Sequence, residues 1–187
     1  ILPLENQERL EMYNTKYHIW REIISMRMLT NLVRKRMTPH MPIIYKDYIC
    51  NNCDYNNPKI NKKSKMCVLM LNELSDMDLA NWIILFSKIK TTNEKREQIW
   101  STVFFQIWVM LFYAIIAFQL RHHDFHWGNI LVNICDETLQ TNYDIDGHRE
   151  YDVNGVTFYV PNHKILTKLW DFGRSFSITH FVYNPEE

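Results

Sequence analysis

Three oxygen-bearing side chains in the second half of the chain could together carry out chemistry. Asp124 and Asn129 lie five residues apart, directly after a long apolar segment, and Asp171 begins the triplet Asp171–Phe172–Gly173. Carboxylate and amide oxygens suit Mg²⁺, and phosphoryl transfer from Mg-ATP needs mainly metal ligands and a group that orients the attacking hydroxyl. We therefore expect Asn129 and Asp171 to bind the metal and Asp124 to accept the hydroxyl proton. Gly173 is expected to let the backbone turn beside the metal.

The apolar segment before Asp124, residues 103–120, must position this cluster. It is long enough to cross a bilayer, but Gln106 and Gln119 interrupt it, and titratable residues follow without a polar anchor. We therefore favour a helix that is fully buried in a soluble core over a membrane-spanning helix. Thr92 or Asn93 is expected to cap it.

Hydrophobic periodicity predicts the other elements. Two helices are expected, at about 17–36 and at 78–89, the second capped by Asp76 or Asp78. A polar stretch with turn signals is expected at 135–155. Strands are expected at 43–50, 66–71, 129–134, 156–161 and 164–170. Helices and strands that are grouped in this way indicate an α+β fold with a helical half.

Charge and cysteine content restrict the possible partners and compartment. The 187 residues include 21 basic and 21 acidic side chains, so there is no electrostatic case for nucleic acid or a membrane surface. The four cysteines predict free thiols in a reducing compartment rather than a disulfide framework. The alternative is half of a zinc site, made from Cys50, Cys53, Cys67 and His40. Residues 144–147 predict a turn, with a calcium loop as the alternative.

Two motifs resemble those of protein kinases. The segment HHDFHWGN is similar to the kinase catalytic loop, with His122–His123–Asp124 in the place of His-Arg-Asp, and WDFGRS contains the Asp-Phe-Gly signature. The finer resemblance is to haspin-like kinases and to the serine/threonine kinases of large DNA viruses, iridoviruses among them, because His126 follows the base by two residues. REIISMRMLTNL resembles helix C, and NELSDMDL resembles the hinge that leads to helix D.

This resemblance implies a protein-kinase-like α+β fold and a set of site residues. A mostly helical C-lobe would span 72–187, and a truncated or incomplete N-lobe would span 1–71. Asp124 would be the catalytic base, and His126 would contact the transferring phosphate. Glu22 would be the helix C glutamate that pairs with a phosphate-anchoring lysine. ATP and Mg²⁺ would be the cofactors, with the adenine bound by Met70, Leu71, Asn72, Glu73 and Leu74, and Gly173 beside the metal.

The chain also departs from the kinase pattern. The first glycine is Gly128, and no strand lysine precedes the helix C segment. We expect a portion of a larger serine/threonine kinase that acts on a protein substrate. The alternatives are a pseudokinase or structural virion component that uses the fold as a docking scaffold, and a small-molecule phosphotransferase. The expected location is intracellular, in cytoplasm or nucleus, or in a virion with other virion proteins as partners.

Overall fold

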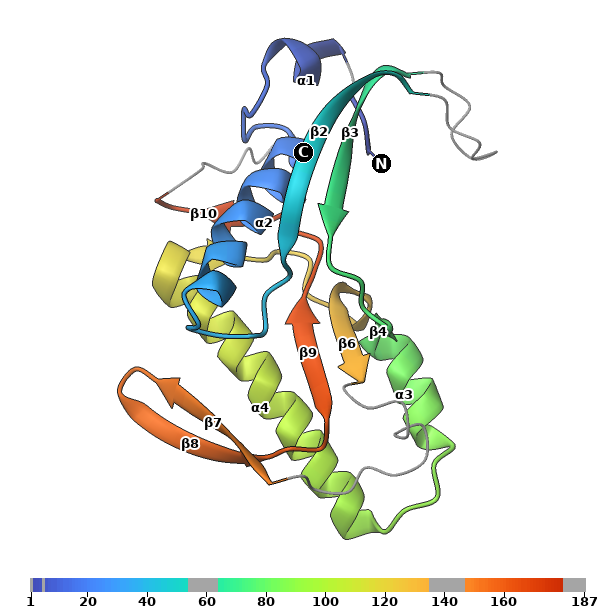
Figure 1. Ribbon diagram of the computed structural model, residues 1–187, viewed down its shortest axis with the longest axis vertical. Helices are drawn as coiled ribbons and strands as arrows, with labels where there is room; N and C mark the ends of the chain where they lie inside the picture. The colour runs from blue at the N-terminus through green and yellow to red at the C-terminus, as the bar shows by residue number, and fades with distance from the viewer. Residues whose placement is uncertain (1, 5, 54–63, 135–146, 180–187) are drawn as a thin grey trace.

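The first region of the structure, a computed structural model, is a three-stranded antiparallel sheet with one long helix beside it (Figure 1). The structure describes residues 2–4, 6–53, 64–134 and 147–179. The strand order is β1–β3–β2, and β2 and β3 form a long hairpin. The elements of this region are β1 (Leu2–Pro3), α1 (Asn6–Leu10), α2 (His18–Arg34), β2 (Ile44–Cys53) and β3 (Ser64–Asn72).

The second region combines helices with short antiparallel sheets. Its central sheet has the order β4–β6–β9, a hairpin β7–β8 lies against α4, and β5 pairs with β10 (Figure 1). The helical elements are α3 (Leu79–Ser87), α4 (Asn93–Phe118) and the 3₁₀ turn η1 (Trp127–Asn129). The strands are β4 (Met77–Asp78), β5 (Leu120–Arg121), β6 (Ile130–Ile134), β7 (His148–Val153), β8 (Val156–Pro161), β9 (Ile165–Leu169) and β10 (Phe176–Ser177).

Side-chain caps decide where α3 and α4 begin. Asp78 accepts a hydrogen bond from the backbone N–H of Asn81 at 2.7 Å, and Thr92 accepts one from Lys95 at 3.3 Å. Each cap satisfies an N–H group that the first helical turn leaves without a partner. Of the alternatives, Asp78 rather than Asp76 is therefore the cap of α3, and Thr92 is the cap of α4.

The prediction that the segment 103–120 is fully buried is wrong, because α4 buries only one face. On the inner face, Gln106 donates to the carbonyl of Ile165 at 2.9 Å and accepts from the N–H of Thr167 at 2.8 Å, which ties α4 to β9. On the outer face, Trp108 and Ile116 are 46% and 66% exposed. By length and mean hydropathy α4 would be able to cross a membrane, but the inner face packs on the sheet.

The prediction of free cysteines is wrong for two of them. Cys53 and Cys67 form a disulfide across the β2–β3 hairpin, with 6.1 Å between their Cα atoms. Cys50 is a free thiol. Within the described ranges, no three His, Cys, Asp or Glu side chains are grouped to hold a metal ion. The zinc alternative is therefore wrong as well.

The β7–β8 hairpin contains one predicted strand and one that was missed: β8 is the strand expected at 156–161, whereas β7 lies in the polar stretch where only turn signals were recognised. Strand β7 pairs with β8 in register from His148 opposite Pro161 to Val153 opposite Val156. Asn154 and Gly155 form the turn, with φ of 53° and 79°, as expected of an Asn-Gly hairpin. The predicted turn or calcium loop at 144–147 falls largely on residues 144–146, which are outside the described residues.

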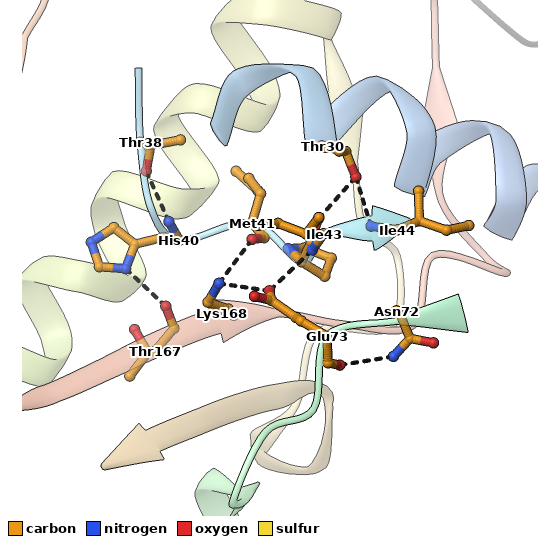
Figure 2. A network of polar contacts seen from close by, with 11 residues as sticks. Thr30, Thr38, His40, Met41, Ile43, Ile44, Asn72, Glu73, Thr167 and Lys168 are labelled. Carbon is orange, nitrogen blue, oxygen red and sulfur yellow. Dashed lines mark hydrogen bonds and ion pairs between the residues drawn. The ribbon is translucent and has the colours of Figure 1, made fainter. Parts of the chain in front are cut away.

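A buried polar network joins the two regions (Figure 2). The ammonium of Lys168, on β9, lies 2.6 Å from the carboxylate of Glu73, at the end of β3. The same carboxylate accepts the backbone N–H of Ile43 at 3.0 Å, and Lys168 also donates to the carbonyl of Met41 at 3.5 Å. The side chains of Lys168 and Glu73 are only 6% and 15% exposed. This ion pair therefore fixes the end of β3 against β9.

Replacing Lys168 with methionine is expected to lower the free energy of unfolding by about 3 kcal/mol, because a buried carboxylate loses its cation. The double variant Lys168→Met/Glu73→Gln should recover part of this loss. Urea unfolding measures both changes. The control is Arg174→Met, which breaks an ion pair with Asp124 whose two side chains are 73% and 29% exposed, and which should cost about 1 kcal/mol or less. Equal losses at the two pairs would contradict this prediction.

Candidate active site

Pairing of β6 with β9 brings Asn129 and Asp171 to the same end of a sheet. Asn129 directly precedes β6, Asp171 follows β9 by two residues, and Ile130 lies opposite Leu169. The N–H of Trp170 donates to the carbonyl of Asn129 at 2.9 Å, which extends the ladder to the site. An antiparallel pair places the start of one strand beside the end of the other, so residues 42 positions apart become neighbours.

Asn129 also holds the loop that carries Asp124. Its side-chain N–H donates to the carbonyl of Asp124 at 3.0 Å, and the residue is buried. Since the nitrogen faces a carbonyl, the amide oxygen Oδ1 must point elsewhere, and within the described ranges it accepts no hydrogen bond. An amide oxygen that accepts no hydrogen bond from the described residues, close to a carboxylate loop, would suit a hard cation such as Mg²⁺.

His122 connects the Asp124 loop with the end of β9. Its Nε2–H donates to the carbonyl of Trp170 at 2.7 Å, and its Nδ1 accepts the N–H of Asp124 at 3.3 Å. Acceptance at Nδ1 requires the neutral ring, and burial lowers the pKa of His122, which favours that form. The ring also packs on Phe172, with centroids 5.3 Å apart. The prediction that His122 has a structural role, bonding to nearby backbone, is therefore confirmed.

Asp124 and Asp171 line one cleft of about 700 Å³. The predicted carboxylates thus face the same space, and Asn129 lies against the backbone of one of them. The guanidinium of Arg174 lies 3.6 Å from the Asp124 carboxylate and is 73% exposed. The residues that line the cleft are His18, Arg21, His123, Asp124, Asp171, Gly173 and Arg174. A cleft that is lined by both cationic side chains and carboxylates would suit a metal–phosphate ligand.

The chain is similar to a viral protein that is described as a probable protein kinase. It is 24% identical over an alignment of length 161, which covers 83% of the chain, to the "Probable serine/threonine-protein kinase 380R" of Invertebrate iridescent virus 6. The chain spans 27% of the length of that relative. No protein-family model matches the chain. The similarity supports a distant relation to protein kinases.

Glu22 lies on α2 and contacts the segment that follows Asp171. Its carboxylate accepts the backbone N–H of Phe172. Burial, and then the charge of Asp171, raise the pKa of Glu22 from 4.5 to about 8. No lysine or arginine of the described ranges forms an ion pair with Glu22. The lysine that the kinase resemblance implies as its partner is therefore not found in the part of the chain that the structure describes.

The pKa of Glu22 predicts a loss of stability at alkaline pH. The pKa of Glu22 is higher in the folded state than in the unfolded state. The contribution of Glu22 to folding stability is therefore full below pH 4.5 and is lost as the pH rises to about 8. Burial lowers the pKa of His40 to about 4. The contribution of His40 to folding stability is therefore full above its ordinary pKa of 6.5 and is lost only as the pH falls. Between pH 6.5 and 8, Glu22 should therefore dominate and lower the free energy of unfolding by about 2 kcal/mol.

Urea unfolding at pH 6.5 and pH 8 measures this change, and Glu22→Gln should remove most of it because glutamine does not titrate. A wild-type pH slope that persists in the Gln variant would contradict the assignment to Glu22.

The backbone turn in the segment 171–173 occurs at Asp171 and not at Gly173. Asp171 has φ of 60°, in the left-handed region that aspartate tolerates better than most residues. Gly173 is not among the positive-φ glycines, and a Cβ there would meet the Asp171 carboxylate at 3.5 Å, an ordinary contact. The predicted reason for a glycine at this position is therefore wrong, although Gly173 does line the cleft.

The remaining predicted residues lie around the site. Nδ1 of His126 accepts the N–H of Gly128 at 3.1 Å and caps η1, so contact with a phosphate stays a prediction for its other nitrogen. The predicted adenine segment runs from the end of β3 into the connection to β4, and Leu74 is 91% exposed. Glu73 has a structural role through Lys168. Adenine contacts of Met70, Leu71, Asn72 and Leu74 stay predictions.

Sequence reasoning missed several residues of the cleft. Arg21 precedes Glu22, Arg174 follows Gly173, and His18 begins α2. Arg174 could have been noticed, because it directly follows the Asp-Phe-Gly triplet. His18 lies outside the motifs, and Arg21 lies in the helix C segment without a role assigned to it. Only the approach of α2 to the Asp171 segment brings the two residues to the cleft.

Proposed function

We propose that this chain forms the phosphate-transfer centre of a serine/threonine protein kinase of the haspin-like or large-virus type, which transfers the γ-phosphate of Mg-ATP to a protein hydroxyl. The proposal rests mainly on the arrangement of three side chains. Asp124 and Asp171 line the same cleft, and the side chain of Asn129 donates a hydrogen bond to the backbone carbonyl of Asp124. The similarity to a viral kinase supports it. A kinase-like fold, divided near residue 71 into N-lobe and C-lobe parts, belongs to the same proposal.

In this proposal each side chain has a separate task. Asp124 accepts the proton of the substrate hydroxyl and orients it toward the phosphate. The carboxylate of Asp171 and the amide oxygen of Asn129 hold Mg²⁺, which neutralises charge on the phosphates when bound. His126 contacts the transferring phosphate, and residues 70–72 together with Leu74 receive the adenine. The relevant compartment is the cytoplasm or nucleus, or a virion whose other proteins are partners.

Transfer of labelled γ-phosphate to a mixture of serine- and threonine-containing proteins tests the proposal. We expect label in phosphoserine or phosphothreonine, dependent on Mg²⁺. Label on a small metabolite alone would instead support the small-molecule phosphotransferase.

A docking scaffold is the second candidate, and the specific observation in its favour is the absence of a cation beside Glu22 in the described part of the chain. A scaffold should show no transfer and no rise in melting temperature with Mg-ATP. A kinase should show both.

A further inference from the structure

Three residues of α2 form hydrogen bonds with the segment after Asp171. Glu22 accepts the N–H of Phe172. Nε of Arg21 donates to the carbonyl of Gly173 at 2.8 Å. One turn further along the helix, the hydroxyl of Ser25 lies 3.0 Å from that of Ser175, and both serines are fully buried.

The serine pair has a definite direction. The hydroxyl of Ser175 donates to the carbonyl of Phe172 at 2.7 Å. Since its only hydrogen is used there, the hydroxyl of Ser25 must be the donor to Ser175. Helix α2 therefore binds the N–H of Phe172 directly, through Glu22. It contacts the carbonyl of Phe172 indirectly, through Ser25 and Ser175, and the carbonyl of Gly173 through Arg21.

Arg21 is well suited to hold a backbone segment in place. It is 3% exposed, and its Nη1 donates to the carbonyls of Thr15 and Lys16 at 3.1 and 2.8 Å. A planar guanidinium with several fixed donors can bridge the turn before α2 and the carbonyl of Gly173 at once, which the single ammonium of a lysine cannot reproduce. Hydrogen bonds from a buried cation are also stronger than neutral ones.

These contacts act on the residue next to Asp171. With φ of 60°, Asp171 has a backbone conformation that few residues adopt, and such a conformation persists only when its surroundings hold it. Phe172 is held at its N–H, at its carbonyl and through its ring on His122. Fixing Phe172 fixes the direction in which the Asp171 side chain leaves the backbone.

We infer that Arg21 and Ser25 are positioning residues, which hold Asp171 in the orientation that binds the metal and make that orientation depend on α2. This inference rests on the proposed function. Partners of metal ligands typically contribute 10- to 100-fold to metal affinity or activity. Arg21→Met and Ser25→Ala should therefore each raise the Mg²⁺ concentration for half-maximal phosphate transfer about 10-fold, with the KM for the protein substrate unchanged.

A second measurement does not depend on activity. Hydrogen exchange at the amides of 172–175 should become faster in Arg21→Met and in Ser25→Ala, because both variants free this segment from α2. Compared with Arg21→Met, the variant Arg21→Lys should recover folding stability but not the wild-type dependence of phosphate transfer on Mg²⁺. Arg27→Met on the same helix, and Ser101→Ala, whose hydroxyl donates to a helix carbonyl at 2.8 Å, are the matched controls and should change neither measurement.

The outcomes distinguish a failure of the positioning role from a failure of the proposed function. If wild type transfers phosphate, but the Mg²⁺ dependence and the exchange of 172–175 stay at wild-type values in both variants, the positioning role is overturned and the proposed function stands. A higher KM for ATP in Arg21→Met alone, with Ser25→Ala unchanged, also overturns it, because Arg21 would then act by direct phosphate contact. If wild type transfers no phosphate under any Mg²⁺ concentration, the proposed function fails and the inference with it.

Discussion

Replacing Asp171 with asparagine should lower the rate of phosphate transfer about 1000-fold, the loss expected when a main electrostatic contact of the transition state is removed. Asparagine has nearly the same shape and tolerates the left-handed backbone that Asp171 adopts, with φ of 60°. Alanine would add strain at this position. Loss of activity in the Asn variant can therefore be assigned to the missing charge rather than to misfolding.

The measurement is the initial rate of transfer across a range of Mg²⁺ concentrations, together with the melting temperature with and without Mg-ATP. The matched control is Asp152→Asn in the β7–β8 hairpin, where an exposed carboxylate also accepts a backbone N–H close in sequence, that of Gly155 at 3.0 Å. The control should keep its activity. If the Asp171 variant stays as active as wild type at all Mg²⁺ concentrations, Asp171 is not a metal ligand.

Replacing Asp124 with asparagine should lower kcat by about 100- to 10,000-fold, the range for loss of a general base. The KM for ATP should hardly change, since Asp124 is assigned to the hydroxyl and not to the nucleotide. The fold should be retained, because Asp124 contributes its backbone N–H to His122 and its carbonyl to Asn129, and both groups remain in the variant. The ion pair with Arg174, which is 73% exposed, should contribute little to stability.

Single-turnover transfer and urea unfolding measure these two effects separately. A variant that keeps its kcat would remove the general-base role. Equal losses of kcat and of folding free energy would mean that Asp124 acts through structure.

Elements with a clear period or cap were well predicted from the sequence. The helix expected at 17–36 is α2, and the strands expected at 43–50 and 66–71 form the β2–β3 hairpin. Their apolar positions follow the periods of helix and strand, which are local properties of the chain. The short pairs β1–β3 and β5–β10 were missed, because two-residue strands exist only through their partners.

The burial of α4 could not be predicted from its composition. A uniformly apolar helix and a helix with one packed face look alike in hydropathy, and only the positions of β8 and β9 decide which side is covered. The disulfide was missed for a similar reason. Cys53 and Cys67 are 14 residues apart, and the pairing of two strands brings them together.

For the candidate site, the sequence by itself determined the residue types at 124, 129 and 171. It also showed that Asp124 follows a predicted helix and that Asp171 follows a predicted strand. Residue type carries the chemistry of a carboxylate or amide regardless of the fold. The tertiary structure alone decided that Asp124 and Asp171 share a cleft, that Glu22 is buried without a cation in the described residues, and that Arg21 and Ser25 reach the Asp171 segment. Burial and contacts across 150 residues depend on how elements pack, which no local pattern in one sequence records.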